Sequence, residues 1–170
     1  MMIKKFFNVF GVDSDSGAFS NNFKFTSGGT NSADPNTLDR YDEATYAHTL
    51  TFGGASVGLT SVSMGGAYTE VGNLVFYTSS IILTSKGSSV GNILISGLPF
   101  TVTTLSHSPS SIFMRNVAIG LGDTAVVALA LANTTTIELY KYSLGQPVKL
   151  TDADITDTTE FRITGFYSKN

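Results

Sequence analysis

Residues 68–100, with the sequence YTEVGNLVFYTSSIILTSKGSSVGNILISGLPF, decide the fold of this chain. They contain two apolar runs, 74–84 and 92–96, which are separated by the glycine- and serine-rich segment 86–91 and followed by a Gly-Leu-Pro stop. Runs rich in Val, Ile, Tyr and Phe between Gly, Ser and Pro are typical of β-strands. We therefore predict two strands that pair as a hairpin across the intervening turn.

The longer run, 74–84, is apolar on both faces. Because side chains alternate along a strand, one face carries Val75, Tyr77, Ile81 and Leu83. The opposite face carries Leu74, Phe76 and Ile82. Such a strand is either central to a sandwich or has its outer face covered by another subunit. The second alternative makes Leu74, Phe76 and Ile82 candidate subunit-interface residues.

The rest of the chain also favours strands. Its 170 residues are 42% hydrophobic and only 14% charged, which is too apolar for a disordered chain and enough for one domain with a core. Further strand-like runs lie at 46–52, 57–63, 113–121, 124–131, 136–142, 148–151 and 160–167, with turns between them, one of them at 65–66. Turn signals at a spacing of roughly 8–12 residues are typical of sandwiches. The predicted fold class is all-β, an antiparallel β-sandwich or jelly-roll-like module over residues 38–170, with a single helical turn at 152–156.

Residues 1–37 indicate an extended N-terminal arm in front of this module. Six phenylalanines are spread there among Gly, Ser, Asn and Asp: Phe6, Phe7, Phe10, Phe19, Phe23 and Phe25. Disordered tails usually lack aromatics, so we interpret these six as arm-docking residues that attach the arm to another protein or subunit. An irregular edge strand of the same domain is the alternative. The charged stretch 38–45 is predicted to be a solvated turn that leads into the module.

Composition excludes several classes of partner. The net charge is −3, and the Lys and Arg residues form no basic stripe, so no nucleic acid is expected as a partner. The chain has no cysteine, which excludes disulfides and cysteine-based metal sites. Its longest apolar run, 124–132, is far shorter than the roughly 20 residues that span a bilayer. No membrane insertion is therefore expected.

No motif predicts catalysis, metal binding or a cofactor. Residues 87–91 match Gly-x-Ser-x-Gly, but a nucleophilic serine needs a strand-to-helix turn there, and a strand-like run follows instead. Residues 13–17 begin like a calcium loop, but Lys24 stands where the bidentate Glu belongs. His48 and His107 lack the spacing of a zinc motif. We therefore expect no catalytic residue, no metal and no cofactor.

The tyrosines are the residues best suited to contact a carbohydrate or another subunit, because a Tyr ring is apolar and its tip is polar. There are seven of them: Tyr41, Tyr46, Tyr68, Tyr77, Tyr140, Tyr142 and Tyr167. The sequence does not choose among them.

Five pieces of the sequence, taken in order, resemble a module of tail-fibre, tail-spike and related virion proteins of tailed bacteriophages. Residues 38–56 are similar to LDDYEEGTWTPTLTFGG, 68–75 to YTKIGN-V, 83–89 to LTSKGS, 95–100 to ISGLPF, and 150–167 to the closing segment of the module. The resemblance covers roughly residues 38–167. The chain departs from the family pattern at 46–48, where Tyr-Ala-His replaces Trp-Thr-Pro, so no ligand-binding tryptophan is carried over.

The resemblance implies a β-rich module, commonly trimeric, that is made in the host bacterial cytoplasm and displayed on the virion surface. We expect a non-enzymatic tail-fibre or receptor-binding protein that forms a homotrimer and contacts other virion proteins and the host surface, with a host cell-surface glycan as one partner. A capsid decoration protein, a cement or head fibre that stabilises the head shell, is the alternative. A glycan-degrading enzyme is disfavoured, because the sequence shows no paired carboxylates and the family has no common catalytic motif.

Overall fold

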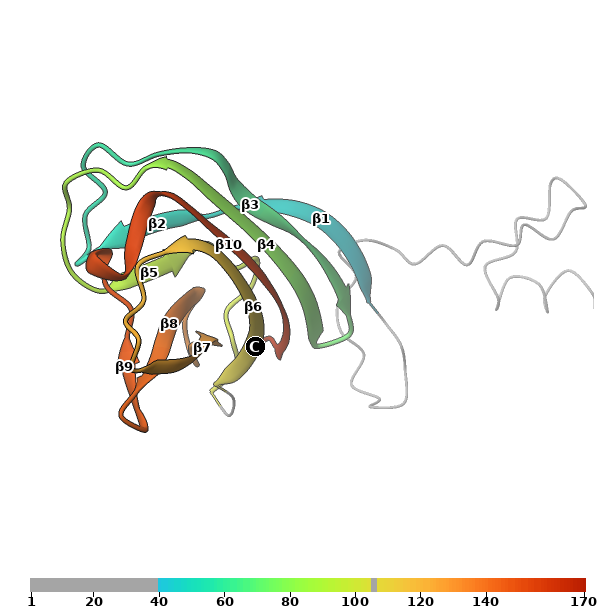
Figure 1. Ribbon diagram of the computed structural model, residues 1–170. Helices are drawn as coiled ribbons and strands as arrows, with labels where there is room; N and C mark the ends of the chain where they lie inside the picture. Colours follow the sequence, from blue (N-terminus) through green and yellow to red (C-terminus); the bar gives the residue numbers. More distant parts are fainter. Residues whose placement is uncertain (1–39, 105–106) are drawn as a thin grey trace, which may run out of the picture.

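The computed structural model describes residues 40–104 and 107–170 (Figure 1). Over these residues the chain forms the strands β1 (Tyr41–Ala47), β2 (Thr49–Phe52), β3 (Thr60–Val71), β4 (Leu74–Ser85), β5 (Ile93–Ser96), β6 (Ser108–Val117), β7 (Asp123–Ala130), β8 (Thr136–Ser143), β9 (Gln146–Lys149) and β10 (Ile155–Ser168). A single 3-10 turn, η1 (Asp152–Asp154), lies where the sequence predicts a helical turn. The predicted all-β, antiparallel fold class is confirmed.

The strands are ordered β1-β3-β4-β10-β6-β7-β8-β5-β2, and β9 pairs with β8. β1 and β2 lie at opposite ends of this order, although only His48 separates them in sequence. The sheet therefore curls almost closed into two layers (Figure 1). Layer A contains β1, β3, β4 and β10, and layer B contains β2, β5, β7, β8 and β9. β6 joins the layers, because one part of it pairs with β10 and another with β7.

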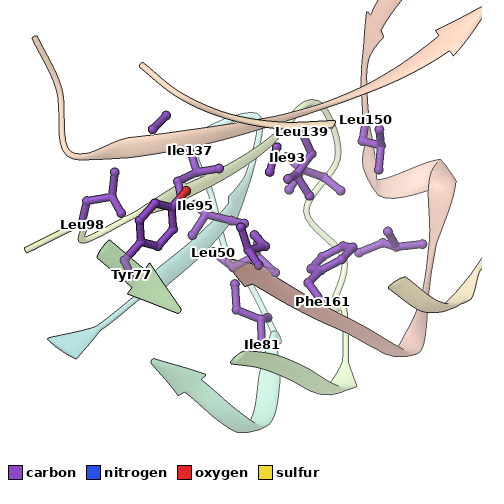
Figure 2. Packing of buried hydrophobic residues seen from close by; sticks show 14 of the residues in the cluster. Leu50, Tyr77, Ile81, Ile93, Ile95, Leu98, Ile137, Leu139, Leu150 and Phe161 are labelled. Atoms are coloured by element: carbon purple, nitrogen blue, oxygen red, sulfur yellow. The ribbon is translucent and has the colours of Figure 1, made fainter. Parts of the chain in front are cut away.

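The core lies between the two layers (Figure 2). Its largest fully buried side chains are Leu50, Phe52, Tyr77, Ile81, Ile93, Ile95, Ile137, Leu139, Leu150, Phe161, Ile163 and Tyr167. β4 contributes Val75, Tyr77, Ile81 and Leu83, so the predicted inner face of this strand is confirmed. Burying each such side chain stabilises the fold by about 1.5–3 kcal/mol relative to exposure.

The predicted hairpin between the two apolar runs is wrong. β4 belongs to layer A, whereas β5 belongs to layer B and pairs with β2 and β8, so residues 86–91 cross from one layer to the other. Close backbone packing fixes this crossing, because a Cβ at Gly87 would lie 2.1 Å from the carbonyl oxygen of Val57. The hairpin that does form joins β3 to β4 through Gly72 and Asn73, and Gly72 has the positive φ of +59° that such short loops need.

Two other turn predictions are also wrong. Gly65 and Gly66 lie inside β3, where a Cβ at Gly66 would come within 1.9 Å of the Thr78 carbonyl oxygen and 2.9 Å of the Tyr46 ring. These glycines therefore allow close packing inside a strand rather than a turn. Of the charged stretch 38–45, residues 41–45 belong to strand β1, which pairs with β3. Charges suit this strand because it lies at the edge of the sheet order.

The two ends of the described segment meet beside the β3–β4 turn. Glu70 is fully buried, and its Oε1 lies 2.6 Å from Arg40 Nε and 2.6 Å from Lys169 Nζ. The Phe100 ring packs against Lys169, whose Nζ lies 4.7 Å from the ring centroid. The mutual attraction of these charges offsets part of the cost of removing them from water. The predicted arm 1–37 and its six phenylalanines lie outside the described residues, so their docking role stays a prediction.

Candidate interaction surfaces

Three phenylalanines lie on the outside of the sandwich where β4, β10 and β6 run side by side. Phe76 on β4, Phe113 on β6 and Phe166 on β10 are 47%, 58% and 58% exposed. Phe76 and Phe166 are direct cross-strand neighbours whose ring centroids lie 6.1 Å apart. Phe113 lies opposite Arg162, four residues along β10 from Phe166, so it shares the face of the other two rings but stands apart from them. Exposed large apolar side chains on one face mark an interaction surface. We call Phe76, Phe113 and Phe166 the phenylalanine face.

Small side chains and paired charges surround these rings. Thr78 and Thr164 lie opposite each other, on β4 and β10. Glu160 contacts Arg162 Nε at 2.7 Å and Arg115 Nη2 at 2.6 Å. The hydrogen bond from Arg162 and the charge of Arg115 hold the pKa of Glu160 below its usual value. Because these charges are paired within the chain, the face suits an apolar partner that approaches closely.

A second exposed apolar group lies at the end of the β8–β9 hairpin. Leu144, in the two-residue turn, is 93% exposed, and Leu121, in the β6–β7 loop, is fully exposed. Tyr142 and Val148, on the two strands of the hairpin, are 38% and 44% exposed but lie on opposite faces of it, because Val148 pairs with Lys141 and Tyr142 with Pro147. We call Leu121 and Leu144 the apolar tip. The hairpin projects at the lower left of Figure 1, whereas β3, β4 and β10 arch across the upper right.

The turn at the apolar tip contains an unfavourable residue. Leu144 and Gly145 both have positive φ values, +50° and +79°, as a type I′ hairpin demands. This conformation favours Gly and Asn, and Asn116 and Asn133 adopt it elsewhere in the chain. An exposed leucine held in a left-handed conformation costs stability without contributing to the core. Strain of this kind is found at functional positions.

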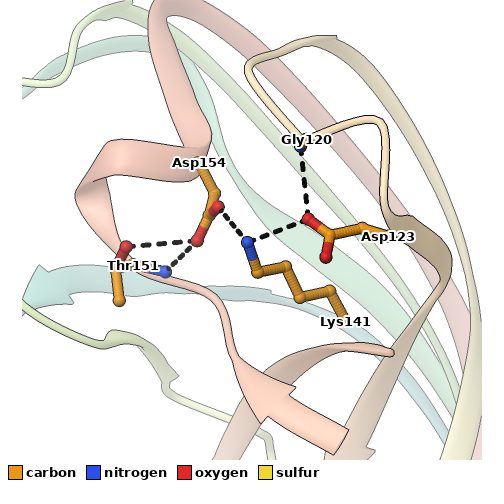
Figure 3. A network of polar contacts seen from close by, with 5 residues as sticks. All are labelled: Gly120, Asp123, Lys141, Thr151 and Asp154. Carbon is orange, nitrogen blue, oxygen red and sulfur yellow. Dashed lines mark hydrogen bonds and ion pairs between the residues drawn. The ribbon is translucent and has the colours of Figure 1, made fainter. Parts of the chain in front are cut away.

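A network of paired charges supports the apolar tip (Figure 3). Lys141 Nζ lies 2.9 Å from Asp123 Oδ2 and 2.7 Å from Asp154 Oδ1. Asp123 also accepts a hydrogen bond from the Gly120 N–H, and Asp154 accepts two from Thr151. The hydrogen bonds that Lys141 donates to Asp154 and Asp123 raise its own pKa. The network ties the loop that carries the exposed Leu121 to β8, so that loop lies beside the β8–β9 hairpin.

The predicted interface residues lie on the outer face, as the alternation indicates, but their exposure is unequal. Phe76 is about half exposed, whereas Leu74 and Ile82 are partly buried. The sequence reasoning missed Phe113 and Phe166, which are more exposed than Phe76. A signal for Phe166 was available, because it falls on the same side of its strand as the polar residues Arg162 and Thr164.

Four other residues that the sequence singled out, Tyr77, Tyr167, Ser89 and His48, are engaged in contacts that stabilise the fold. Tyr77 and Tyr167 are buried in the core. The Ser89 hydroxyl accepts a hydrogen bond from the Val57 N–H at 2.8 Å, in the crossing between layers. His48 is buried and hydrogen-bonded to Ser79, with 2.9 Å between Nε2 and Oγ.

Within residues 40–104 and 107–170, no group of three or more His, Asp and Glu side chains is arranged to hold a metal ion. No helix in the same ranges is long and apolar enough to cross a membrane.

The similarity of this chain to known proteins was found at the level of the fold and not of the sequence. No protein-family model matches the chain, and no curated protein matches it. The crystal structure of the Dettilon tailspike protein (gp208) matches with a TM-score of 0.63 and 19% sequence identity. The match covers 76% of this chain and 24% of the tailspike chain, so the chain spans about a quarter of that protein's length. The β-sandwich is therefore similar to part of a tailspike protein.

Proposed function

We propose that this chain is a non-enzymatic structural protein of a tailed-bacteriophage virion, displayed on the particle surface as a homotrimer. It acts as a tail-fibre or receptor-binding protein, in contact with other virion proteins and with the host surface. The observation that carries the proposal is the exposed phenylalanine face on a fold similar to part of the Dettilon tailspike protein. The resemblance of residues 38–167 to phage virion modules supports the same function.

The phenylalanine face supports self-association on energetic grounds. Phe76, Phe113 and Phe166 are about half exposed in the subunit, so full coverage of each stabilises an assembly by about 0.7–1.7 kcal/mol. Three such side chains per subunit offset a substantial part of the entropy that association costs. A face of this kind is best explained by permanent contact with another subunit.

The carboxylates of the described residues support a non-enzymatic role. Ion pairs with Lys or Arg engage Glu70, Asp123, Glu138, Asp154 and Glu160. Hydrogen bonds engage Asp42, Glu43, Asp152 and Asp157. Glycosidases need two carboxylates about 5–10 Å apart that face the substrate. Carboxylates that already serve structural contacts are poor candidates for that work.

The outer face of layer B offers groups for contact with a host glycan. The Tyr140 hydroxyl donates to Glu138 Oε2 at 2.5 Å, and Lys149 Nζ lies 2.6 Å from Glu138 Oε1. The hydrogen bond to Glu138 raises the pKa of Tyr140 to about 12, so the phenol stays neutral at physiological pH. A neutral tyrosine beside fixed charges combines an apolar ring with hydrogen-bonding groups.

The test is the position of the protein on purified phage particles, by immunogold labelling and by cryo-electron microscopy. We expect labelling at the tail, with three copies around each attachment point. Labelling spread over the head shell would overturn the tail role and assign the chain to capsid decoration. Absence from the particle would contradict the whole proposal. A variant that lacks residues 1–37 should still fold but should be lost from particles, as expected for an attachment arm.

A further inference from the structure

A trimer places a constraint on the phenylalanine face. In a closed assembly of three copies, contacts between subunits are heterologous, so each subunit uses two different surfaces. A face that packed against its own equivalent would give a twofold dimer instead. If the phenylalanine face lies between subunits, a different surface of the next copy must cover it, except where equivalent residues meet at the threefold axis.

We infer that the apolar tip of one copy packs on the phenylalanine face of the next copy and that three such contacts close the trimer. The occupant of each surface is thus a second copy of this chain. This inference rests on the homotrimer of the proposed function, and it specifies which surfaces make that homotrimer.

The chemistry of the two surfaces is complementary. The tip presents two protruding leucines, Leu121 and Leu144, and the face presents the exposed rings of Phe76, Phe113 and Phe166. Branched aliphatic side chains that project from loops can pack between separated aromatic rings, where they gain dispersion contacts and release water.

The charges near both surfaces are paired within the subunit, with one net positive charge beside the face and one net negative charge beneath the tip. Glu160 is paired beside the face with two arginines, and Lys141 is paired beneath the tip with two aspartates. Contact between the surfaces therefore leaves none of these charges buried and unpaired, which would cost several kcal/mol. A second copy of the chain fits both surfaces without a charged partner.

The positions of the two surfaces also fit a closed assembly. The β8–β9 hairpin and the arch of β3, β4 and β10 lie on opposite sides of the subunit (Figure 1). A tip and a face on opposite sides can each contact a different neighbour at the same time. The left-handed conformation of Leu144 supports this role, because the turn holds an apolar side chain outward where Asn or Gly would relieve the strain.

Thiol cross-linking tests the inference directly, because the natural chain contains no cysteine. The full chain would carry Leu144→Cys together with Phe76→Cys, Phe113→Cys or Phe166→Cys, and each double variant would be treated with a short bismaleimide. We expect at least one double variant to form covalent dimers and trimers on a denaturing gel, with no larger species. The matched control pairs Leu144→Cys with Val57→Cys, which is 65% exposed but outside both surfaces.

The outcomes separate this inference from the proposed function. The single-cysteine variants should stay monomeric on the gel, because equivalent residues lie apart in a heterologous trimer. Cross-linking of Phe76→Cys, Phe113→Cys or Phe166→Cys alone would show that the faces meet one another and would overturn the inference. A trimer by light scattering in which no tip–face pair cross-links would overturn the inference but leave the homotrimer standing. A monomer by light scattering would overturn both.

A second set of variants removes the side chains instead of linking them. The double substitutions Leu121→Ser with Leu144→Ser, and Phe76→Ser with Phe166→Ser, should each weaken trimer formation at least tenfold while circular dichroism shows an intact β fold. Tip variants that remain as trimeric as the wild type would contradict the inference. Equal loss of the trimer in both sets would support it, because the two surfaces form the same contact.

Discussion

The phenylalanine face and the apolar tip are both exposed and apolar, but the chain builds them in different ways. The face lies on three long paired strands, and its rings alternate with core side chains such as Tyr77 and Phe161. The tip lies on a two-residue turn and a loop. Its leucines belong to no strand, so they do not alternate with buried core side chains. The comparison shows that the face depends on the core beneath it, whereas the tip depends on local backbone conformation.

The largest difference is expected for glycine substitutions in the two regions. Gly66→Ala, on β3 next to the strands that carry the face, should destabilise the fold by about 3 kcal/mol or more, because the new Cβ meets the Thr78 carbonyl oxygen at 1.9 Å. Gly145→Ala, in the tip, should cost only about 1 kcal/mol, because its Cβ meets nothing within 4 Å and only the positive φ is strained. Chemical denaturation of both variants measures the difference. Equal losses would show that the two regions are not built differently.

The next largest effect is expected on assembly. Phe76→Ser with Phe166→Ser removes two side chains that are each about half exposed in the subunit and are each expected to contribute about 1 kcal/mol to every subunit contact. The dissociation constant should therefore rise by at least about tenfold, as sedimentation analysis over a concentration series measures. Val57→Ser, at an exposed site outside both surfaces, is the control and should leave assembly unchanged. Assembly as tight as in the wild type would remove the face from the interface.

At the tip, one substitution is expected to have two smaller effects of opposite sign, a gain in subunit stability and a loss of trimer affinity. Leu144→Asn should stabilise the subunit by about 0.5 kcal/mol, because Asn tolerates the left-handed conformation better than Leu. The same change should weaken trimer formation about tenfold, since an apolar side chain leaves the contact. Thermal denaturation of the monomer and sedimentation measure the two effects separately. A variant that gained or lost both together would show that Leu144 has no separate role in assembly.

The smallest effect is expected from mild acid. It should lower the stability of the whole subunit and so affect the phenylalanine face and the apolar tip alike. Burial lowers the pKa of His48, which lies at the bend between β1 and β2. The unfolded chain therefore takes up a proton at His48 before the folded chain does, and stability falls as the pH drops below about 6.5. Denaturation of the wild type and of His48→Gln at pH 7.5 and 5.5 measures this. The variant should lose less stability on acidification than the wild type does.

The sequence predicts the face better than the tip, for a physical reason. The alternation along β4 places Phe76 outward and Tyr77 inward, because a period of two is a property of any paired strand. The exposure of Leu121 and Leu144 depends on which loops lie together at one end of the sandwich, and that is set by pairing between β7 and β8. An apolar residue in a predicted turn was the available signal.

The wrong turn predictions have the same origin. Gly65 and Gly66 are typical of a turn, but the Tyr46 ring and the neighbouring strand occupy the space where their side chains would lie. The segment 86–91 also contains turn residues, yet it links two layers instead of two paired strands. Gly87 and Gly91 have the positive φ that turn residues favour, whereas Gly65 and Gly66 do not. In both cases the local sequence says nothing of the distant segment that packs there.

The mass of the intact protein in solution at micromolar concentration, by native mass spectrometry or light scattering, tests the homotrimer most directly. We expect a species that contains three copies of the 18.0 kDa chain. A single copy at that concentration and on the virion would contradict it, because the phenylalanine face and the apolar tip would then have no partner of the kind proposed.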